Sequence, residues 1–151
     1  MLLKQEAIDL IKQFEGFRAK PYLCSAGVPT IGYGSTFYEN GNKVTLQDSP
    51  ITEQKDQELL NLTLNQIFIP GVLRACPNLI SYPNKLGAIV SFAYNLGVGR
   101  LQASTLRRKI NAEDWEGAGA EILKWNLNLG KPSKGLTVRR KAEKKIGRAH
   151  V

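Results

Sequence analysis

An acid, a thiol and a hydroxyl group stand close together in the segment FEGFRAKPYLCSAGVPTIGYGST, which spans residues 14–36. Glu15 is followed nine residues later by Cys24 and fifteen residues later by Thr30. A carboxylic acid kept protonated near neutral pH is what the protonation of a glycosidic oxygen requires. These residue types therefore indicate acid–base chemistry that depends on one carboxyl group.

The position of Glu15 favours its protonated form. Apolar residues recur at three- and four-residue spacing over residues 3–14, which predicts an amphipathic helix, and Gly16 is suited to end it. A helix C-terminus carries partial negative charge and disfavours an ionised carboxylate, and Phe14 and Phe17 would add desolvation in the same direction. The alternative interpretation is a solvent-exposed glutamate at a helix end.

Glycoside hydrolysis normally uses a second carboxylate, and the segment offers none in a suitable place. Between Asp9 and Asp48 the acidic residues are Glu15 and Glu39, and Glu39 falls in a predicted hairpin turn. A cysteine nucleophile needs a histidine to generate its thiolate. The only histidine is His150, the penultimate residue, so a Cys–His hydrolase is disfavoured.

Metal and phosphate chemistry are not expected. One histidine and two distant cysteines, Cys24 and Cys76, form no ligand cluster, so the sequence predicts no metal site and no cofactor. The stretch GYGST (32–36) lacks the lysine and the helix start of a phosphate-binding loop. Its glycines are better explained by a close approach of the backbone to a flat sugar ring.

Helices and a small sheet must position these groups. Pieces of β-prone sequence between 21 and 47 contain the turn signal ENGNK (39–43), which predicts that PTIGYGSTFY pairs with KVTL. Periodic apolar residues predict further helices at 49–68, 83–97, 103–111, 113–125 and 136–147, with IPG (69–71) ending the first of them. The expected fold class is α+β, with a small sheet lobe joined by a long helix to a larger helical lobe and a site in the cleft between them.

Charge is concentrated in the second half of the chain. Residues 1–99 contain eight Lys and Arg against eight Asp and Glu, whereas residues 100–151 contain thirteen against five, which accounts for the net charge of +8. This asymmetry indicates a polyanionic partner such as nucleic acid, anionic lipid or an anionic wall polymer, and the alternative is a solvated helix face. No nucleic-acid-binding motif accompanies the charge, so nucleic acid is not expected as a partner.

The segment EGFRAKPYLCSAGVPTIGYGST closely resembles the signature of the phage-type lysozymes, the endolysins of glycoside hydrolase family 24. The resemblance continues through AIVSFAYNLGVGRLQASTLRRKIN (88–111), WEGAGAEILKWN (115–126) and KGLTVRRKAE (134–143). It covers nearly the whole chain in order. It implies one lysozyme-like domain over 1–151, with a sheet lobe at about 15–50 and a helical lobe at about 70–151 that includes the N-terminal helix 2–14.

The resemblance also implies an activity and a set of site residues. The family hydrolyses the β-1,4 bond between N-acetylmuramic acid and N-acetylglucosamine in peptidoglycan. Glu15 takes the place of the family's acid, and Cys24 and Thr30 take the places of the usual Asp and Thr. The substrate-binding residues carried over are Gly32, Tyr33, Gly34, Asn95, Arg139 and Arg140, with one of the two arginines expected to face Glu15.

Two departures from the family pattern are visible. Cys24 stands where the family usually has Asp, and Ser35 stands where a His is common. A thiol near its free pKa of about 8.5 is mostly protonated at neutral pH and is a weaker base than a carboxylate. We expect an inverting hydrolase, because direct attack by sulfur would leave a stable thioglycoside. The alternatives are a lytic transglycosylase and a non-catalytic wall-binding relative.

The N-terminal stretch MLLKQEAIDLIKQFEG lacks an apolar signal core and a cleavage site, and no run of 18 apolar residues occurs. Together with the family resemblance, this implies a protein stored in the host bacterial cytoplasm that reaches the cell wall after holin-mediated release. The resemblance also implies a monomer. Its expected partners are the peptidoglycan substrate and the anionic surface of the bacterial envelope.

Overall fold

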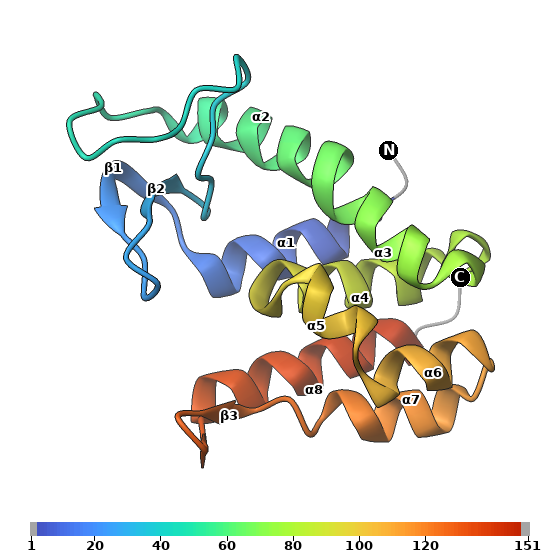
Figure 1. The fold of residues 1–151 in the computed structure, drawn as a ribbon. Helices are drawn as coiled ribbons and strands as arrows, with labels where there is room; N and C mark the ends of the chain where they lie inside the picture. Colours follow the sequence, from blue (N-terminus) through green and yellow to red (C-terminus); the bar gives the residue numbers. More distant parts are fainter. Residues whose placement is uncertain (1–2, 149–151) are drawn as a thin grey trace. The chain divides into compact units, whose positions relative to one another are not determined.

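The computed structural model describes residues 3–148 (Figure 1). Two compact units divide the chain: a hairpin unit of residues 11–67, and a helical unit that comprises the residues up to Leu10 and those from Phe68 onward. The elements of the first part of the chain are α1 (Gln5–Glu15), β1 (Arg18–Leu23), β2 (Pro29–Gly32), α2 (Glu53–Thr63) and the π-helical turn η1 (Leu64–Phe68). Those that follow are α3 (Ile69–Ala75), the 3-10 helix η2 (Pro77–Ser81), α4 (Pro83–Leu96), α5 (Val98–Gln102), α6 (Thr105–Asn111), α7 (Trp115–Ile122), β3 (Leu127–Asn128), β4 (Lys131–Pro132) and α8 (Lys134–Arg148).

The expected α+β class is confirmed, since helices and two small antiparallel sheets make up the described chain. No helix among residues 3–148 is long and apolar enough to cross a membrane. The histidine at position 150 lies outside the described residues.

The sheet of the hairpin unit pairs β1 with β2 in antiparallel register, with Tyr22 opposite Thr30 and Arg18 opposite Gly32. The register shifts between Arg18 and Tyr22, and Pro21 lies within that irregularity, where a residue without an N–H group is tolerated. Gly27 turns the chain between the strands with φ +76° and donates its N–H to the carbonyl of Cys24 at 2.8 Å. The hairpin therefore forms between 18–23 and 29–32, whereas the sequence predicted pairing of residues 29–38 with KVTL.

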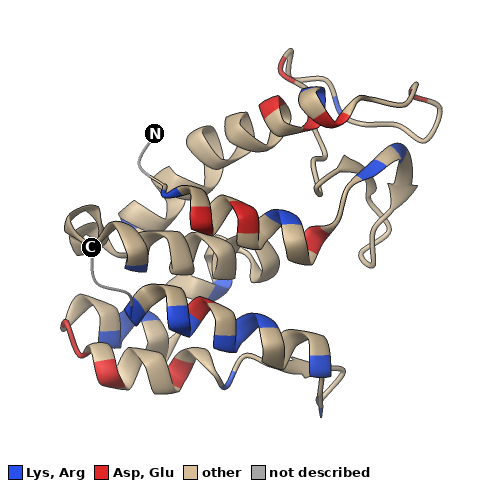
Figure 2. Ribbon diagram, turned by 180° about the vertical axis from the view of Figure 1, so that it is seen from behind, with Lys and Arg blue, Asp and Glu red and all other residues tan. Residues whose placement is uncertain are grey.

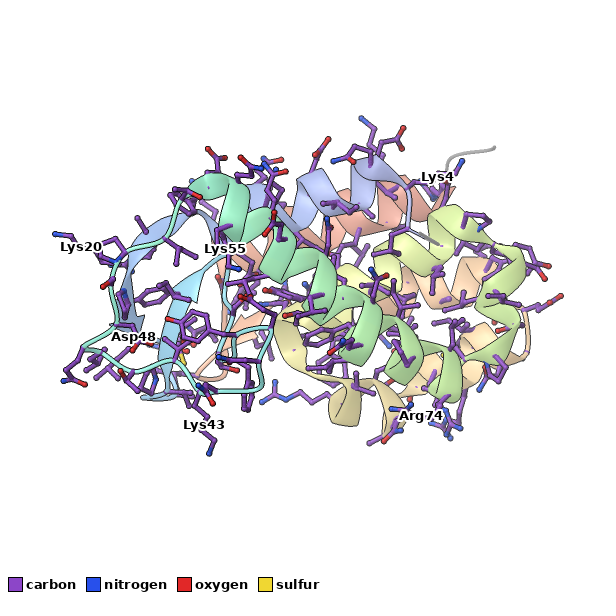
Figure 3. The ribbon with its side chains drawn as sticks, turned by 90° about the horizontal axis from the view of Figure 1, so that it is seen from above. Lys4, Lys20, Lys43, Asp48, Lys55 and Arg74 are labelled. Atoms are coloured by element: carbon purple, nitrogen blue, oxygen red, sulfur yellow. The ribbon has the colours of Figure 1, made fainter. Side chains whose placement is uncertain are left out.

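The predicted partner KVTL does not form a strand. Lys43 makes one isolated bridge with Phe37, and Val44 donates its N–H to the carbonyl of Thr36 at 2.9 Å. Asp48, labelled in Figure 3, fastens the loop instead, because it accepts hydrogen bonds from the Tyr38 hydroxyl at 2.7 Å and from the Thr45 N–H at 2.8 Å. The turn at 39–43 thus belongs to a loop held by side chains.

The helical run that begins at Glu53 continues past the point where the sequence predicted its end. Thr52 caps α2, accepting a hydrogen bond from the Lys55 N–H at 3.1 Å. The prediction that IPG (69–71) ends the helix is wrong: η1 leads directly into α3, which runs to Ala75. Pro70 stands in the first turn of α3, where its missing N–H has no partner to lose.

The core of the helical unit is built around α4, as the sequence predicted. Pro83 begins α4, and Gly97 follows it with φ +96°, a conformation that a residue with a side chain rarely adopts. Phe92 of α4 is fully buried and meets Trp125 edge-on, with ring centroids 5.6 Å apart. Helix α8 packs against α4 in the same unit.

Candidate active site

Glu15 is the last residue of α1, as the sequence predicted, and its side chain is half-buried. The helix ends there because Gly16 adopts φ +71° and donates its N–H to the carbonyl of Lys12 at 2.9 Å. This left-handed conformation is accessible to glycine at little cost. The cap thus fixes the point at which the carboxyl group leaves the helix.

The β1–β2 hairpin brings Cys24 and Thr30 together. Cys24 follows β1 and Thr30 lies within β2, so the tight turn between the strands folds one back on the other. The pKa of the Cys24 thiol is lowered, first by the backbone N–H of Val28, then by that of Ala26, with a further hydrogen bond from Thr30. Thr30 is buried, and its hydroxyl donates to the carbonyl of Val28 at 2.8 Å.

Backbone N–H groups of the turn, rather than a neighbouring cation, are the main cause of the lowered pKa of Cys24. Arg18 lies over the ring of Tyr22, 4.2 Å from its centroid. Backbone amides that point at an acceptor favour its anionic form in the way that they favour a carboxylate.

The Tyr22 hydroxyl is close enough to both Glu15 and Cys24 to be affected by their charges. Burial raises the pKa of the Tyr22 hydroxyl, Arg18 opposes this, and the negative charges of Glu15 and Cys24 raise it further. Both acidic groups therefore act electrostatically on the same hydroxyl from within the hairpin unit. Tyr22 is not among the residues predicted from the sequence. Its position opposite Thr30 could have indicated it, but only if residues 18–23 had been predicted as a strand.

Glu39 supplies no second carboxylate to this group. Its side chain is exposed and forms an ion pair with Lys55 of α2. Ser35 is buried, and its backbone exchanges hydrogen bonds with Ile31 at 2.9 Å in both directions. Its hydroxyl has no hydrogen-bond partner among residues 3–148.

The predicted sugar-binding residues Gly32, Tyr33 and Gly34 form the turn that follows β2. The Tyr33 ring is buried, and its hydroxyl donates to Glu53 of α2 at 2.9 Å. Burial and this hydrogen bond raise the pKa of Tyr33 to about 12. Since the described contacts of the Tyr33 side chain are internal, any contribution of this residue to sugar binding falls to its backbone.

The other predicted binding residues, Asn95, Arg139 and Arg140, meet in the helical unit. Arg140 donates to the Asn95 side chain at 2.9 Å and pairs with Glu143, with 2.7 Å between Arg140 Nε and Glu143 Oε1. Arg139 pairs with the same carboxylate at 3.3 Å and donates to the carbonyl of Ser91 at 3.1 Å. Burial raises the pKa of Glu143, and Arg140 and Arg139 oppose that shift. The expectation that one arginine faces Glu15 remains a prediction.

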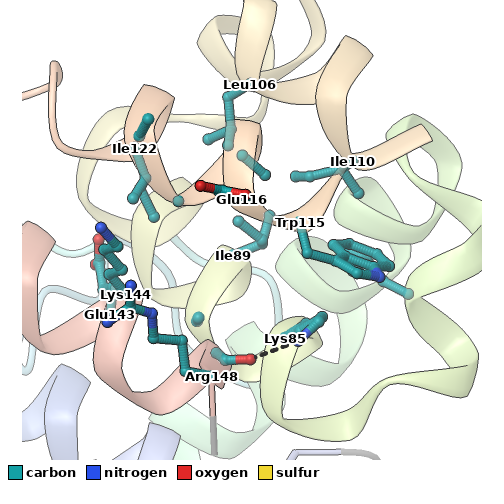
Figure 4. A pocket seen from close by; sticks show the side chains of 16 residues that line it. Lys85, Ile89, Leu106, Ile110, Trp115, Glu116, Ile122, Glu143, Lys144 and Arg148 are labelled. Atoms are coloured by element: carbon teal, nitrogen blue, oxygen red, sulfur yellow. Dashed lines mark hydrogen bonds between the residues drawn. The ribbon is translucent and has the colours of Figure 1, made fainter. Parts of the chain in front are cut away.

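A cavity of about 280 Å³ lies within the helical unit (Figure 4). Apolar side chains such as Ile89, Leu106, Ile110 and Ile122 line much of it, with Lys85 and Arg148 among its charged residues. Lys85 donates to the carbonyl of Gly147 at 2.7 Å. None of the residues predicted to take part in catalysis or sugar binding lines this cavity.

A glutamate at a helix end, followed by a β-hairpin that carries Cys24 and Thr30, agrees with the predicted resemblance to the phage-type lysozymes. The family model described as phage lysozyme matches residues 12–143. Two similar curated proteins are endolysins: that of Bacillus phage B103 is 36% identical over 97% of this chain and 54% of its own length, and that of Acyrthosiphon pisum secondary endosymbiont phage 1 is 36% identical over 97% of each. The chain thus spans about half the length of the Bacillus phage relative.

Solved structures agree with this assignment. An endolysin from the Escherichia coli O157:H7 phage FAHEc1 has a TM-score of 0.81 and 32% identity, covering 98% of this chain and 94% of that one. The chain belongs to the phage lysozyme family and is a phage peptidoglycan hydrolase of the glycoside hydrolase class. Other relatives, such as that of bacteriophage PS119 with 36% identity over 87% of this chain, are named SAR-endolysins.

Proposed function

We propose that this enzyme is an N-acetylmuramidase that hydrolyses the β-1,4 bond between N-acetylmuramic acid and N-acetylglucosamine, with Glu15 as the proton donor and Cys24 with Thr30 at the attacking water. The observation that carries the proposal is the hydrogen-bonded pair of Cys24 and Thr30 in the same unit as Glu15. Glu15 protonates the leaving oxygen, and Cys24 with Thr30 takes the place of the second carboxylate that glycosidases normally use.

The turn between β1 and β2 prepares the thiol for this role. The N–H groups of Val28 and Ala26 stabilise the thiolate, so Cys24 ionises more readily than a free cysteine. The Thr30 hydroxyl has one proton, which it directs either to the carbonyl of Val28 at 2.8 Å or to the Cys24 sulfur, where it stabilises the thiolate. Water held between sulfur and hydroxyl would attack the sugar carbon from the face opposite Glu15.

The stereochemical course follows from the chemistry of sulfur. A thiolate that attacked the anomeric carbon would form a thioglycoside, whose C–S bond is hard to hydrolyse. Direct attack by water avoids this intermediate, and we therefore propose inversion. In inverting enzymes the acid and the base leave room for a water molecule between base and sugar.

The test of Glu15 is its replacement by glutamine, which keeps the size of the side chain and removes the proton. Glu15→Gln should abolish lysis of permeabilised cells and leave the melting temperature almost unchanged. Mass spectrometry of peptidoglycan digested by the wild-type enzyme then defines the reaction. Reducing ends support hydrolysis, whereas anhydro-muramic ends would assign the enzyme as a lytic transglycosylase, and intact polymer would assign it as a non-catalytic wall-binding relative.

We propose that Gly32, Gly34 and the backbone of Tyr33 face the sugar, and that Arg139, Arg140 and Asn95 contribute from the helical unit. Gly34 adopts φ +106°, a conformation that favours glycine, and the absence of a side chain there supports a close approach of the backbone to substrate. The arginines share the Glu143 carboxylate, so their guanidinium groups are held rigidly. Whether either of them acts on Glu15 is tested by the effect of Arg139→Lys and Arg140→Lys on the pH profile of turnover.

Release to the wall is the second part of the proposal. Relatives named SAR-endolysins indicate that family members differ in how they are released. We propose storage of a monomer in the host cytoplasm and release through a holin, the route expected from the family resemblance. Expression in host cells with and without a holin tests this: lysis without any holin would favour a secretory route.

A further inference from the structure

A buried carboxyl group that the proposed mechanism does not use lies beside the site. Asp56 is the fourth residue of α2, and its side chain is fully buried. Its Oδ1 atom accepts a hydrogen bond from the N–H of Tyr33 at 3.1 Å. A carboxylate rarely enters a protein interior unless hydrogen bonds or charges compensate for its desolvation. This bond therefore links α2 to the turn that follows Thr30.

Gly32 has no side chain because Asp56 occupies that space. A Cβ atom built on Gly32 would lie 1.8 Å from Asp56 Oδ1 and 2.3 Å from its carboxyl carbon, far inside van der Waals contact. Gly32 also adopts φ +68°, which disfavours any residue with a side chain. The carboxyl group and the glycine are thus complementary in shape.

A second hydrogen bond holds the same residue of the turn. The Tyr33 hydroxyl donates to Glu53 at 2.9 Å. The first turn of α2 therefore accepts hydrogen bonds from both the backbone N–H and the side chain of Tyr33. The ring of Tyr33 lies 5.8 Å from that of Phe17, and the Lys12 ammonium lies 5.5 Å from its centroid. Thr30 lies in β2, three residues before Tyr33.

The charges around Asp56 leave its carboxyl group poised to titrate. Burial raises its pKa to about 6, the Tyr33 N–H opposes the shift, Glu53 adds to it and Lys12 opposes it. Its Oδ2 atom has no hydrogen-bond partner among the described residues. An ionised carboxylate accepts a hydrogen bond more strongly than a neutral acid does, so the hydrogen bond from the Tyr33 N–H to Asp56 is stronger above this pKa.

We propose that Asp56 is a positioning residue, whose carboxylate holds the Gly32–Gly34 turn and through it sets the place of Thr30 beside Cys24. This inference rests on the roles proposed above for Thr30 and Cys24. A displacement of a reacting group by about 1 Å can reduce turnover by about 100-fold, so a distant hydrogen bond can matter for catalysis.

The kinetic test compares three variants on purified peptidoglycan. Asp56→Ala removes the acceptor of the Tyr33 N–H and should lower kcat by about 10- to 100-fold with KM within about twofold of wild type. Asp56→Asn keeps an acceptor oxygen and should restore most of kcat at neutral pH, but without the rise in turnover that wild type shows as pH passes through about 6. Glu58→Gln, at an exposed carboxylate on the same helix, is the matched control and should behave as wild type.

An NMR titration tests the linkage without relying on activity. In wild type the amide signals of Tyr33 and Thr30 should shift together with a midpoint near pH 6, and in Asp56→Asn neither should shift there. Unchanged kcat in folded Asp56→Ala, or a Thr30 signal indifferent to this titration, would overturn the proposal. If Asp56→Ala does not fold, the Asp56→Asn profiles decide. A wild-type enzyme that never cleaves peptidoglycan would defeat the proposed function, whereas the NMR result would still judge the linkage.

Discussion

At the scale of single residues, Cys24 is the position where this enzyme departs most from the carboxylate chemistry of glycosidases. The hairpin turn gives its sulfur two backbone N–H groups and a threonine hydroxyl, the kind of environment that an aspartate would also use. A thiol in that environment can be partly ionised at a pH where a free cysteine is not. Under the role proposed for Cys24, the exchange of a carboxylate for a thiol therefore changes the strength of the base more than it changes the hydrogen bonds around it.

Replacement of Cys24 tests whether the thiolate is the working form. Because the thiol pKa is lowered, its contribution appears as pH rises through that lowered pKa and is lost below it. Cys24→Ala should reduce kcat by about 100-fold, the usual size of a lost acid–base contribution, and Cys24→Asp should retain activity and extend it to lower pH. Turnover measured between pH 4 and pH 9 decides this. Full activity after alkylation of Cys24 would remove the thiol from the mechanism.

The titration of Asp56 predicts how the stability of the protein depends on pH. Its folded-state pKa is raised to about 6 from 3.8, so folding favours the protonated acid. The contribution of Asp56 to the free energy of unfolding should be greatest below about pH 4, decrease as pH rises to about 6, and stay constant above that. Relative to Asp56→Asn, this loss should reach up to about 3 kcal/mol. Urea unfolding of both proteins at pH 4, 5, 6 and 7 measures it, and parallel curves would contradict the prediction.

At the scale of elements, the end of α1 decides where Glu15 is presented. The three-and-four spacing of apolar residues predicted this helix and its end correctly, because one face of α1 is buried and Gly16 closes its last turn. The hairpin was harder to predict. Pro21 argues against a strand, yet β1 tolerates it at an irregularity in the register.

Gly16→Ala tests the dependence of Glu15 on the helix cap. Space is not the obstacle, since no atom lies within 4 Å of a Cβ placed there, but φ +71° is strained for alanine. The substitution should cost about 1 kcal/mol of stability and lower kcat, because the carboxyl group leaves the helix at an altered angle. Gly99→Ala is the control, as Gly99 lies in α5 with equal space and without a positive φ. Thermal melts and turnover of the two variants should therefore diverge.

Across the whole molecule, elements were easier to predict than contacts. Long periodic helices such as α4 and α8 appear in the sequence because burial of one face imposes a pattern on it. Asp56 left no such signal, since a charged residue in the first turn of a helix is usually exposed. The continuation of α2 into α3 was missed because Pro70 ordinarily ends a helix, but not when it begins a new one.

The uneven charge of the chain predicts that α8 takes part in binding the anionic wall. Basic residues recur along α8 (Figure 2), and Lys141 and Lys145 are exposed one helical turn apart on one face. Lys141→Gln with Lys145→Gln should raise the half-saturating amount of intact wall and make its cleavage less sensitive to salt. Rates on short soluble peptidoglycan fragments should change much less, because the substituted side chains belong to no part of the proposed site.

A matched pair of substitutions separates the location of charge from its total. Lys20→Gln with Lys43→Gln removes the same two charges from exposed positions in the hairpin unit. If α8 is the surface that meets the wall, this control should affect cleavage of intact wall less than the α8 pair does at every salt concentration. Equal effects would mean that net charge alone, rather than the basic face of α8, draws the enzyme to its substrate.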